Sequence, residues 1–266
     1  MLDSRPAGPE YRTVFETLHI TSDGPLARLT LNRPERLNAL SLQTLDELVA
    51  AVREINAQPQ VRVVIVGGKG RAFCAGADLR NFEGDDTAAA RAAAEAGRAM
   101  AEAIEGLRAV SIARIQGWCV GGGVVLAAAC DLRIAAASAR FSIPEVALGI
   151  PLAWGGIPRL VAEIGPARTK ELVMTCREFT PAEARQMGFL NEVAEEDALD
   201  DAVAALAKTL LARPAYPLQA TKRHVNAVSA GASGLARSWS DADSLLAGLE
   251  DPECEAARQR YLAARR

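Results

Sequence analysis

Two short stretches rich in glycine and alanine could bind an oxygen atom with backbone groups alone. Residues 74–78 read CAGAD after an apolar run, and residues 121–123 are three glycines directly before an apolar helical run. Glycine inside a helix costs roughly 0.5–1 kcal/mol, so three in a row suggest that something lies close against the backbone. Free N–H groups at a helix start are positively polarised and can point at an oxygen. Together the stretches could form an oxyanion hole, in which one donor is typically worth ~3–4 kcal/mol of barrier.

A simpler explanation is that such glycines only make tight turns and close packing. For Gly67, Gly68 and Gly70, which follow a predicted strand, that explanation is sufficient. Two nucleotide-binding explanations fail, because neither GxGxxG nor GxxxxGK[ST] is present.

Glu145 is the candidate acid–base group. It follows a proline and lies between the apolar residues Ile143 and Val146. A carboxyl group in an apolar pocket has a raised pKa, which makes it a better base near neutral pH. Taken alone, Glu145 fits an ordinary exposed loop glutamate equally well.

The composition excludes several classes of protein. The 266 residues carry a net charge of −3 and no basic stripe with aromatic residues, so we expect no nucleic-acid partner. We expect no membrane span and no signal peptide, and hence a cytoplasmic protein. Five cysteines without a CxxC pair, and only two histidines, predict reduced thiols and no metal site.

The elements that would position these groups follow from hydrophobic patterning. Residues 15–20 and 26–32 alternate around the turn signal SDGP and predict a β-hairpin. Ser41 can cap a helix, and 61–68 is a β-branched run typical of a buried strand. Further strands are predicted at 111–117, 131–137, 139–143 and 190–194, with helices at 87–107 and 122–130. From residue 155 the pattern is mainly helical, with Pro166 in a first turn and Thr180 as a cap before Pro181.

The strand and helix order predicts an α/β core followed by helices. We divide it into a core at residues 1–200 that carries the site and a helical oligomerisation region at 201–266. The first ten residues are expected to form a loose arm. Apolar spacing in the tail, at Leu206, Leu210 and Leu235, suggests a helical region that does not bury itself alone.

Four segments in this order resemble the crotonase family, the enoyl-CoA hydratases and isomerases. They are LTLNRPERLNAL (29–40), RAFCAGADL (71–79), IQGWCVGGGVVLAAACDLRIA (115–135) and FSIPEVALGI (141–150). The resemblance implies a spiral of ββα units, a homotrimer or hexamer, and acyl-CoA thioesters as substrates. It implies no cofactor, since coenzyme A is part of the substrate.

The resemblance also assigns roles to residues. The backbone N–H groups of Ala77 and Gly122 would hold the thioester oxygen as it becomes an enolate, and Glu145 would move the proton. Substrate contacts would come from the segment near Arg36 and Leu37 and from the two glycine-containing loops and their surroundings. Besides Arg36 and Leu37, the substrate-binding residues expected are Ala75, Gly76, Asp78, Leu79, Arg80, Gly121, Val125 and Trp154. For Arg36 and Arg80 a solvated surface role is nearly as good an explanation, and Asp78 could instead stabilise its loop.

This sequence departs from the family pattern at two positions. The hydratases have a second glutamate two residues after the glycines, where this chain has Val125. Trp154 stands in a stretch that usually has small residues; it could narrow the acyl pocket or simply pack on the next helix. The chain's end also departs from the usual pattern, which leaves a contact of Arg258 or Tyr261 with a neighbouring subunit's CoA open.

A single carboxyl group favours isomerisation of 3-enoyl-CoA to 2-enoyl-CoA, which needs one base. Hydration of 2-enoyl-CoA, which the hydratases carry out with two carboxylates, is the alternative. A non-catalytic acyl-CoA-binding protein is a further alternative, against which the retention of Glu145 counts.

Overall fold

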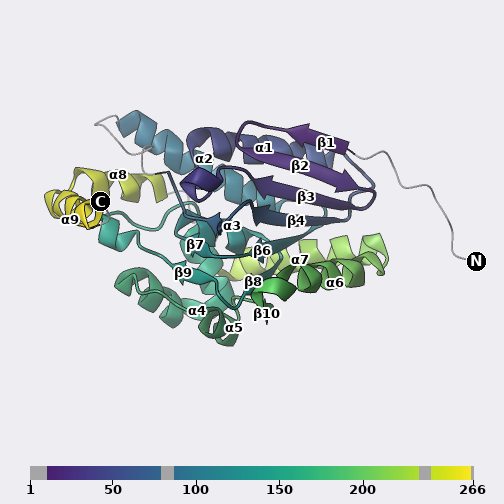
Figure 1. The fold of residues 1–266 in the computed structure, drawn as a ribbon. Helices are drawn as coiled ribbons and strands as arrows, with labels where there is room; N and C mark the ends of the chain where they lie inside the picture. Colours follow the sequence, from purple (N-terminus) through teal and green to yellow (C-terminus); the bar gives the residue numbers. More distant parts are fainter. Residues whose placement is uncertain (1–10, 79–86, 234–240, 265–266) are drawn as a thin grey trace, which may run out of the picture.

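Two β-sheets form the centre of the molecule (Figure 1). The computed structural model describes residues 11–78, 87–233 and 241–264, so the predicted N-terminal arm lies outside the described residues. The strands are β1 (Tyr11–Val14), β2 (Leu18–Asp23), β3 (Leu26–Leu31), β4 (Val63–Gly68), β5 (Ala72–Cys74), β6 (Val110–Ile115), β7 (Trp118–Val120), β8 (Leu132–Ala136), β9 (Arg140–Ser142) and β10 (Glu192–Ala194). The α-helices are α1 (Leu42–Asn56), α2 (Thr87–Glu105), α3 (Gly122–Ala129), α4 (Gly156–Thr175), α5 (Pro181–Met187), α6 (Leu199–Leu211), α7 (Ala215–Ser233), α8 (Asp241–Glu250) and α9 (Pro252–Ala263). Short 3-10 helices are η1 (Pro34–Arg36), η3 (Val146–Leu148) and η4 (Glu196–Ala198).

The larger sheet has the strand order β1-β2-β3-β4-β6-β8-β10. Its first three strands pair antiparallel, which confirms the predicted hairpin, and the pairs from β3 to β10 are parallel. The smaller sheet has the order β5-β7-β9 and is parallel throughout. Sequence patterning did not indicate β1 or a second sheet.

The chain repeats one unit three times, and this confirms the predicted spiral of ββα units. The units are β4-β5-α2, β6-β7-α3 and β8-β9-α4, where η3 precedes the last helix. Each unit places one strand in the larger sheet and the next in the smaller sheet. Equivalent parts of successive units therefore become neighbours, including the loops that follow β5, β7 and β9.

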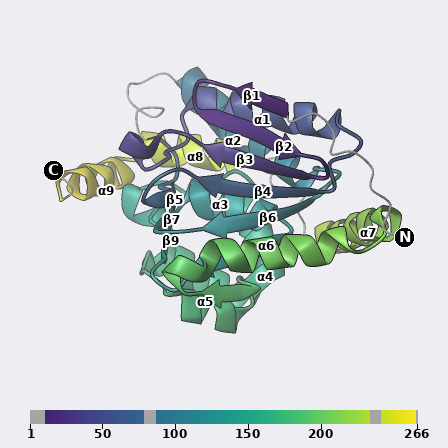
Figure 2. The same ribbon diagram turned by 45° about the vertical axis from the view of Figure 1, so that its right-hand side comes forward.

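Apolar side chains cover both faces of the larger sheet. One face contributes Leu29, Val64 and Val66 to the main core, together with the buried residues of α1 and α3. The other face packs against α6, which crosses it in Figure 2. Leu206 and Leu210 are partly buried and pack against this second cluster. These two side chains are therefore only partly covered within the chain, and Leu235 lies outside the described residues.

Helix boundaries follow the predicted capping residues. The Ser41 side chain accepts a hydrogen bond from the Thr44 N–H and begins α1. Thr180 and Glu183 form a reciprocal capping box, with Pro181 in the first turn of α5. Gly165 has φ +77° and breaks α4, so Pro166 begins a second helical segment as predicted.

The helices at the C-terminus pack on the chain's own core. Buried Lys222 ties α7 to the sheet, because its Nζ lies 2.7 Å from Asp131 Oδ2 and 3.0 Å from the carbonyl oxygen of Ala109. Leu245 of α8 is buried beside Ala94 of α2. No helix within the described ranges is long and apolar enough to cross a membrane.

Candidate active site

The ends of three parallel strands bring the predicted site residues together. Within the smaller sheet Cys74 pairs with Cys119, and Val120 pairs with Ser142. The segments 75–78, 121–123 and 143–145 follow these strand ends directly. Strands that run parallel end at the same edge of a sheet. Loops predicted from three separate motifs therefore form one site.

A β-bridge turns the N–H group of Ala77 away from Leu40. Leu40 pairs with Ala77: the Leu40 N–H donates to the Gly76 carbonyl at 2.8 Å, and its carbonyl accepts from the Asp78 N–H at 2.9 Å. In such a bridge the central residue directs its own N–H and C=O to the other side. Ala77 lines the cavity described below. The Ala77 N–H, on the side away from Leu40, is therefore a candidate donor to a bound oxygen.

Gly122 is the first residue of α3 and offers a second candidate donor. The first N–H groups of a helix have no partner in the preceding turn. A Cβ atom at Gly76 would lie 2.8 Å from the Val120 carbonyl oxygen and 3.4 Å from the Gly122 nitrogen. Gly76 also has φ +94°, which favours glycine. The absence of a side chain there allows the two donor loops to approach each other.

At each of the three consecutive glycines, another part of the protein fills the space that a side chain would need. A Cβ atom at Gly121 would lie 2.3 Å from Glu145 Oε1 and one at Gly122 2.3 Å from the Trp154 ring. A Cβ atom at Gly123 would lie 2.4 Å from the Cys74 carbonyl oxygen. The expectation that something lies close against this backbone is confirmed. What lies there, however, is the acid–base candidate, an indole ring and the neighbouring loop, so approach of a thioester is not the only reason for these glycines.

Arg33 fixes the loop that carries Ala77, and Asn38 fixes the segment before that loop. Arg33 donates to Asp78 Oδ2 at 3.0 Å, and both side chains are largely buried. Asn38 has φ +57°, and its side-chain amide donates to the carbonyl oxygens of Lys69 and Ala72 at 3.0 and 2.8 Å. Asp78 thus stabilises its loop, which was the alternative to direct substrate contact.

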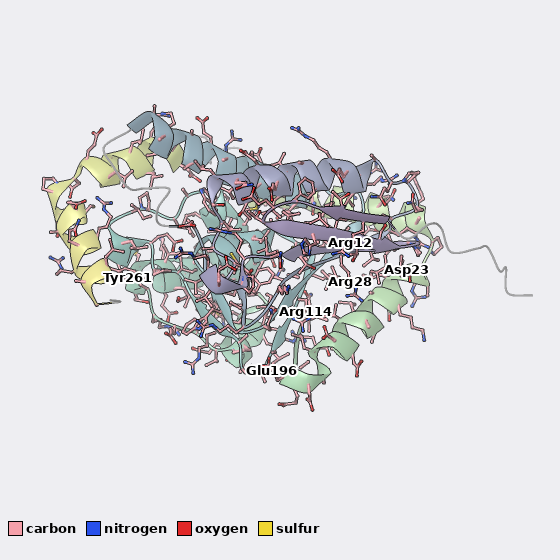
Figure 3. The ribbon with its side chains drawn as sticks, turned by 45° about the horizontal axis from the view of Figure 1, so that its top comes forward. Arg12, Asp23, Arg28, Arg114, Glu196 and Tyr261 are labelled. Atoms are coloured by element: carbon pink, nitrogen blue, oxygen red, sulfur yellow. The ribbon has the colours of Figure 1, made fainter. Side chains whose placement is uncertain are left out.

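A largely apolar cavity opens beside the two donors. It offers about 90 Å³ to the centres of water-sized molecules, several times the roughly 10–15 Å³ that one water needs. Tyr261 of α9 reaches it from the same chain, and Figure 3 shows this residue on α9. The lining residues are Ala75, Gly76, Ala77, Val120, Gly121, Gly122, Val125, Pro144, Glu145, Leu148, Ile150, Pro151, Leu152, Ala153, Trp154, Leu245 and Tyr261.

The cavity contains residues that sequence patterning could not assign to it. Leu245 lies about a hundred residues beyond Glu145, and only the packing of α8 on α2 brings it to the site. Tyr261 was considered only as a contact from a neighbouring subunit. Both come from residues 201–266, so this region contributes to the chain's own site. The division into a core and a separate oligomerisation region remains a prediction.

Glu145 is partly buried, lines this cavity and has one buried carboxyl oxygen. Its Oε2 has less than 1 Å² of exposed surface and no hydrogen-bond partner among the described residues. Burial raises the pKa of Glu145 to about 7, opposed in part by a hydrogen bond from its own backbone N–H. A carboxyl group with this pKa can both accept and release a proton near neutral pH.

No second carboxyl group lines the cavity among the described residues. Val125, at the position where the hydratases have a glutamate, is fully buried and lines the wall. Its Cγ2 would lie 2.9 Å from a Cβ atom at Gly156, so it is closely packed against the start of α4. Glu145 and Tyr261 are the two ionisable side chains in the described part of the lining.

The remaining predicted residues lie outside this cavity or outside the described ranges. Arg36 is exposed on η1, and Leu37 is partly buried with φ +50°. The Leu37 carbonyl accepts a hydrogen bond from the Ala75 N–H at 2.9 Å, which joins this segment to the donor loop. Leu79 and Arg80 lie outside the described residues.

The cysteines near the site behave as small apolar side chains. Burial raises the pKa of the Cys74 thiol to about 12 and also raises the pKa of Cys119 well above its ordinary value. Thiols with such pKa values carry almost no thiolate at neutral pH. Among the described residues, no group of three histidine, cysteine, aspartate or glutamate side chains could hold a metal ion.

Comparisons with known proteins agree with this geometry. The family model described as enoyl-CoA hydratase/isomerase matches residues 21–264. A crotonyl-CoA hydratase from Syntrophomonas wolfei is 34% identical over 213 residues, covering 80% of this chain and 82% of the relative. A peroxisomal Delta(3,5)-Delta(2,4)-dienoyl-CoA isomerase from Arabidopsis thaliana is 34% identical over 225 residues, covering 80% and 81%. The crystal structure of an enoyl-CoA hydratase/carnithine racemase from Magnetospirillum magneticum matches with a TM-score of 0.78, 31% identity and 82% coverage of both chains.

Proposed function

Because the chain belongs to the enoyl-CoA hydratase/isomerase family, we propose that it isomerises 3-enoyl-CoA to 2-enoyl-CoA. The observation that carries this proposal is that one carboxyl group, that of Glu145 with its buried Oε2, and the apolar Val125 line the same cavity. Moving a double bond from the 3,4 to the 2,3 position needs one proton shuttle. Adding water needs a group that orients the water as well as one that delivers the proton.

In the proposed reaction the Glu145 carboxylate removes a proton from C2 of the substrate. The C–H electrons become part of a dienolate, and negative charge develops on the thioester oxygen. The N–H groups of Ala77 and Gly122 stabilise that charge. Protonated Glu145 then returns the proton to C4, and the double bond remains between C2 and C3.

Hydration of 2-enoyl-CoA is the second candidate, since the relative from Syntrophomonas wolfei is named a hydratase. Among the described residues, Tyr261 is the one ionisable lining side chain besides Glu145 that could orient a water molecule. The non-catalytic alternative is less well supported, because a protein that only binds acyl-CoA does not need a buried carboxyl group beside the thioester.

A crystal structure of the Glu145→Gln variant with 3-hexenoyl-CoA tests the proposed arrangement. We expect the thioester oxygen within hydrogen-bond distance of both the Ala77 and Gly122 nitrogens, with C2 and C4 facing residue 145. A thioester bound with its carbonyl oxygen elsewhere would contradict the proposal.

The isomerisation should depend on pH through Glu145. Its pKa of about 7 means that the carboxylate form needed to remove the C2 proton is lost as the pH falls below 7. We therefore expect kcat/KM to fall about tenfold for each pH unit below 7 and to level off above it. Steady-state rates between pH 5 and 8.5 measure this profile. A profile that is flat across pH 5–7 would show that Glu145 is not the base.

Introducing the missing carboxyl group should favour hydration. In Val125→Glu we expect the ratio of hydration to isomerisation to rise at least about tenfold, a small part of the 10²–10⁴ that acid–base groups contribute. Val125→Gln has the same shape without the acid and should leave the ratio unchanged. Since a new buried charge destabilises the core, both variants are compared by rates per folded molecule. An equal ratio in the two variants would contradict the role given to Val125.

We also propose that the protein is a homotrimer or hexamer. Exposed apolar side chains on α7, namely Tyr216, Val225 and Val228, are available for contact between copies. Light scattering on the purified protein should give a mass of three or six times 28.1 kDa. A stable monomer at micromolar concentration would contradict this expectation.

A further inference from the structure

Trp154 adopts a backbone conformation that is rare for a bulky residue. Its φ is +63°, in the left-handed region that favours glycine, and its side chain is almost completely buried. A strained residue of this kind persists only where its surroundings hold it in place, and such residues concentrate at functional sites. Two questions therefore arise: which contacts hold Trp154 in this conformation, and what its ring does at the site.

Two charged residues hold the backbone at Trp154. Buried Arg159 donates from Nη1 to the carbonyl oxygens of Trp154 and Gly155 at 3.2 and 3.1 Å. The same guanidinium donates to Glu105 Oε2 at the end of α2, at 2.6 Å. Asp241 of α8 accepts a hydrogen bond from the Gly155 N–H at 2.8 Å. Elements from three parts of the chain thus fix where the indole is placed.

The indole fills the space between α2 and α3, and a glycine on each helix makes room for it. A Cβ atom at Gly97 of α2 would lie 2.0–2.2 Å from ring atoms including Nε1. A Cβ atom at Gly122 of α3 would lie 2.3 Å from the opposite edge of the ring. Gly97 interrupts the alanine-rich helix α2, where alanine would be the better helix former. The ring is therefore wedged between α2 and the proposed oxyanion donor.

The ring also forms part of the apolar wall of the cavity. Trp154 lines it together with Val125, Leu152 and Leu245, none of which carries a polar side chain. A thioester whose oxygen is held at Gly122 would have its acyl group beside the indole. Each carbon beyond the reacting C2–C4 segment then needs space that the ring occupies.

We propose that Trp154 limits the length of the acyl chain and restricts the enzyme to short-chain acyl-CoA thioesters. This inference rests on the proposed function, because it assumes a thioester held at Ala77 and Gly122. Removing the ring joins the space between Gly97 and Gly122 to the cavity. An additional buried methylene group is worth up to about fourfold in kcat/KM, so the variant gains on longer chains.

The test compares 3-enoyl-CoA substrates of four, six, eight and ten carbons. In the wild type we expect kcat/KM to fall beyond six carbons. In Trp154→Ala the ratio of the eight-carbon to the four-carbon value should rise at least about tenfold, with a smaller rise in Trp154→Phe. Trp118→Ala is the matched control, because this tryptophan packs near Arg140 outside the cavity lining, and its profile should remain that of the wild type. An unchanged profile in folded Trp154→Ala overturns the proposal.

A second variant tests the position of the ring without removing it. Gly97→Ala adds one methyl group that pushes the indole toward Gly122 and the cavity. Turnover of the four-carbon substrate should fall at least about tenfold, although alanine favours the helix. Trp154 fluorescence is measured in a background that lacks Trp118 and Trp239. If Gly97→Ala keeps full turnover and leaves this fluorescence unchanged, the wedged arrangement is wrong.

Binding affinity for saturated acyl-CoA tests the length limit independently of the proposed reaction. Titration calorimetry with saturated butanoyl-CoA and decanoyl-CoA needs no turnover. The wild type should bind butanoyl-CoA more tightly, and Trp154→Ala should reverse the preference. If this reversal is seen and no thioester is isomerised, the proposed reaction is wrong and the length limit stands. If isomerisation is seen without the reversal, the length limit is wrong.

Discussion

Glu145→Gln is expected to lower the rate of 3-enoyl-CoA isomerisation by a factor of about 10² to 10⁴, the usual contribution of a general base. Glutamine keeps the shape of the side chain beside Gly121 but cannot remove the C2 proton. Steady-state rates on 3-hexenoyl-CoA, together with the affinity for hexanoyl-CoA, measure the effect. A loss of turnover with retained affinity fits the proposed role, whereas less than a tenfold loss would show that another group moves the proton.

Measuring the stability of the same variant tests whether unfolding could cause the loss of activity. Burial raises the pKa of Glu145 from 4.5 to about 7, so the folded protein binds an extra proton between these pH values. This contribution to the free energy of unfolding is present below pH 4.5 and is lost as the pH rises through 7, a loss of about 3 kcal/mol. Glutamine does not titrate, so the variant does not lose this stability as the pH rises. Thermal unfolding should therefore show Glu145→Gln gaining stability over the wild type as the pH rises from 4.5 to 8.

Removing the N–H group of Gly122 should lower turnover by a factor of about 10² to 10³, the usual effect of losing one oxyanion donor. Proline fits the first position of a helix and removes only this donor from α3. Any side chain at this position meets the Trp154 ring, however, because a Cβ atom there would lie 2.3 Å from it. A single Gly122→Pro substitution would therefore combine two effects.

A pair of double variants isolates the donor. In Trp154→Ala, the ring that blocks residue 122 is absent, and Gly122→Ala and Gly122→Pro can be compared in this background. Both add a Cβ atom, and the alanine variant alone keeps the N–H group. Assayed on the eight-carbon substrate, the proline variant should be the slower by the factor given above. Equal rates in the two folded double variants would show that the Gly122 N–H is not an oxyanion donor.

The sequence was sufficient for the elements that local chemistry determines. Ser41 and the Thr180–Pro181 pair were identified from capping preferences alone, because a side-chain oxygen or a fixed φ acts within one turn. The β-branched run before Gly67 is a strand buried on both faces, as its composition indicates. Glu145 lies at a strand end beside the glycines. Its motif indicated a place at the site, whereas its immediate neighbours alone did not.

Long-range packing explains what the sequence did not indicate. The three strands of the smaller sheet have only three residues each, too few for a clear alternation, and they pair only because the spiral brings successive units together. Leu245 and Tyr261 reach the cavity through helix packing that no local pattern encodes. Trp154 had two competing interpretations, a wall of the acyl pocket or a core residue on the next helix; its ring lines the cavity and packs against α2 and α3.

The central claim, that one carboxyl group serves an isomerisation, is tested most directly by two rates on one preparation of the wild-type protein. The first is the conversion of 3-hexenoyl-CoA to 2-hexenoyl-CoA, followed by chromatography. The second is the hydration of 2-hexenoyl-CoA to the 3-hydroxy product under the same conditions. With Glu145 alone and Val125 in the second position, we predict that kcat/KM for isomerisation exceeds that for hydration by at least about tenfold. Efficient hydration with poor isomerisation would contradict the claim.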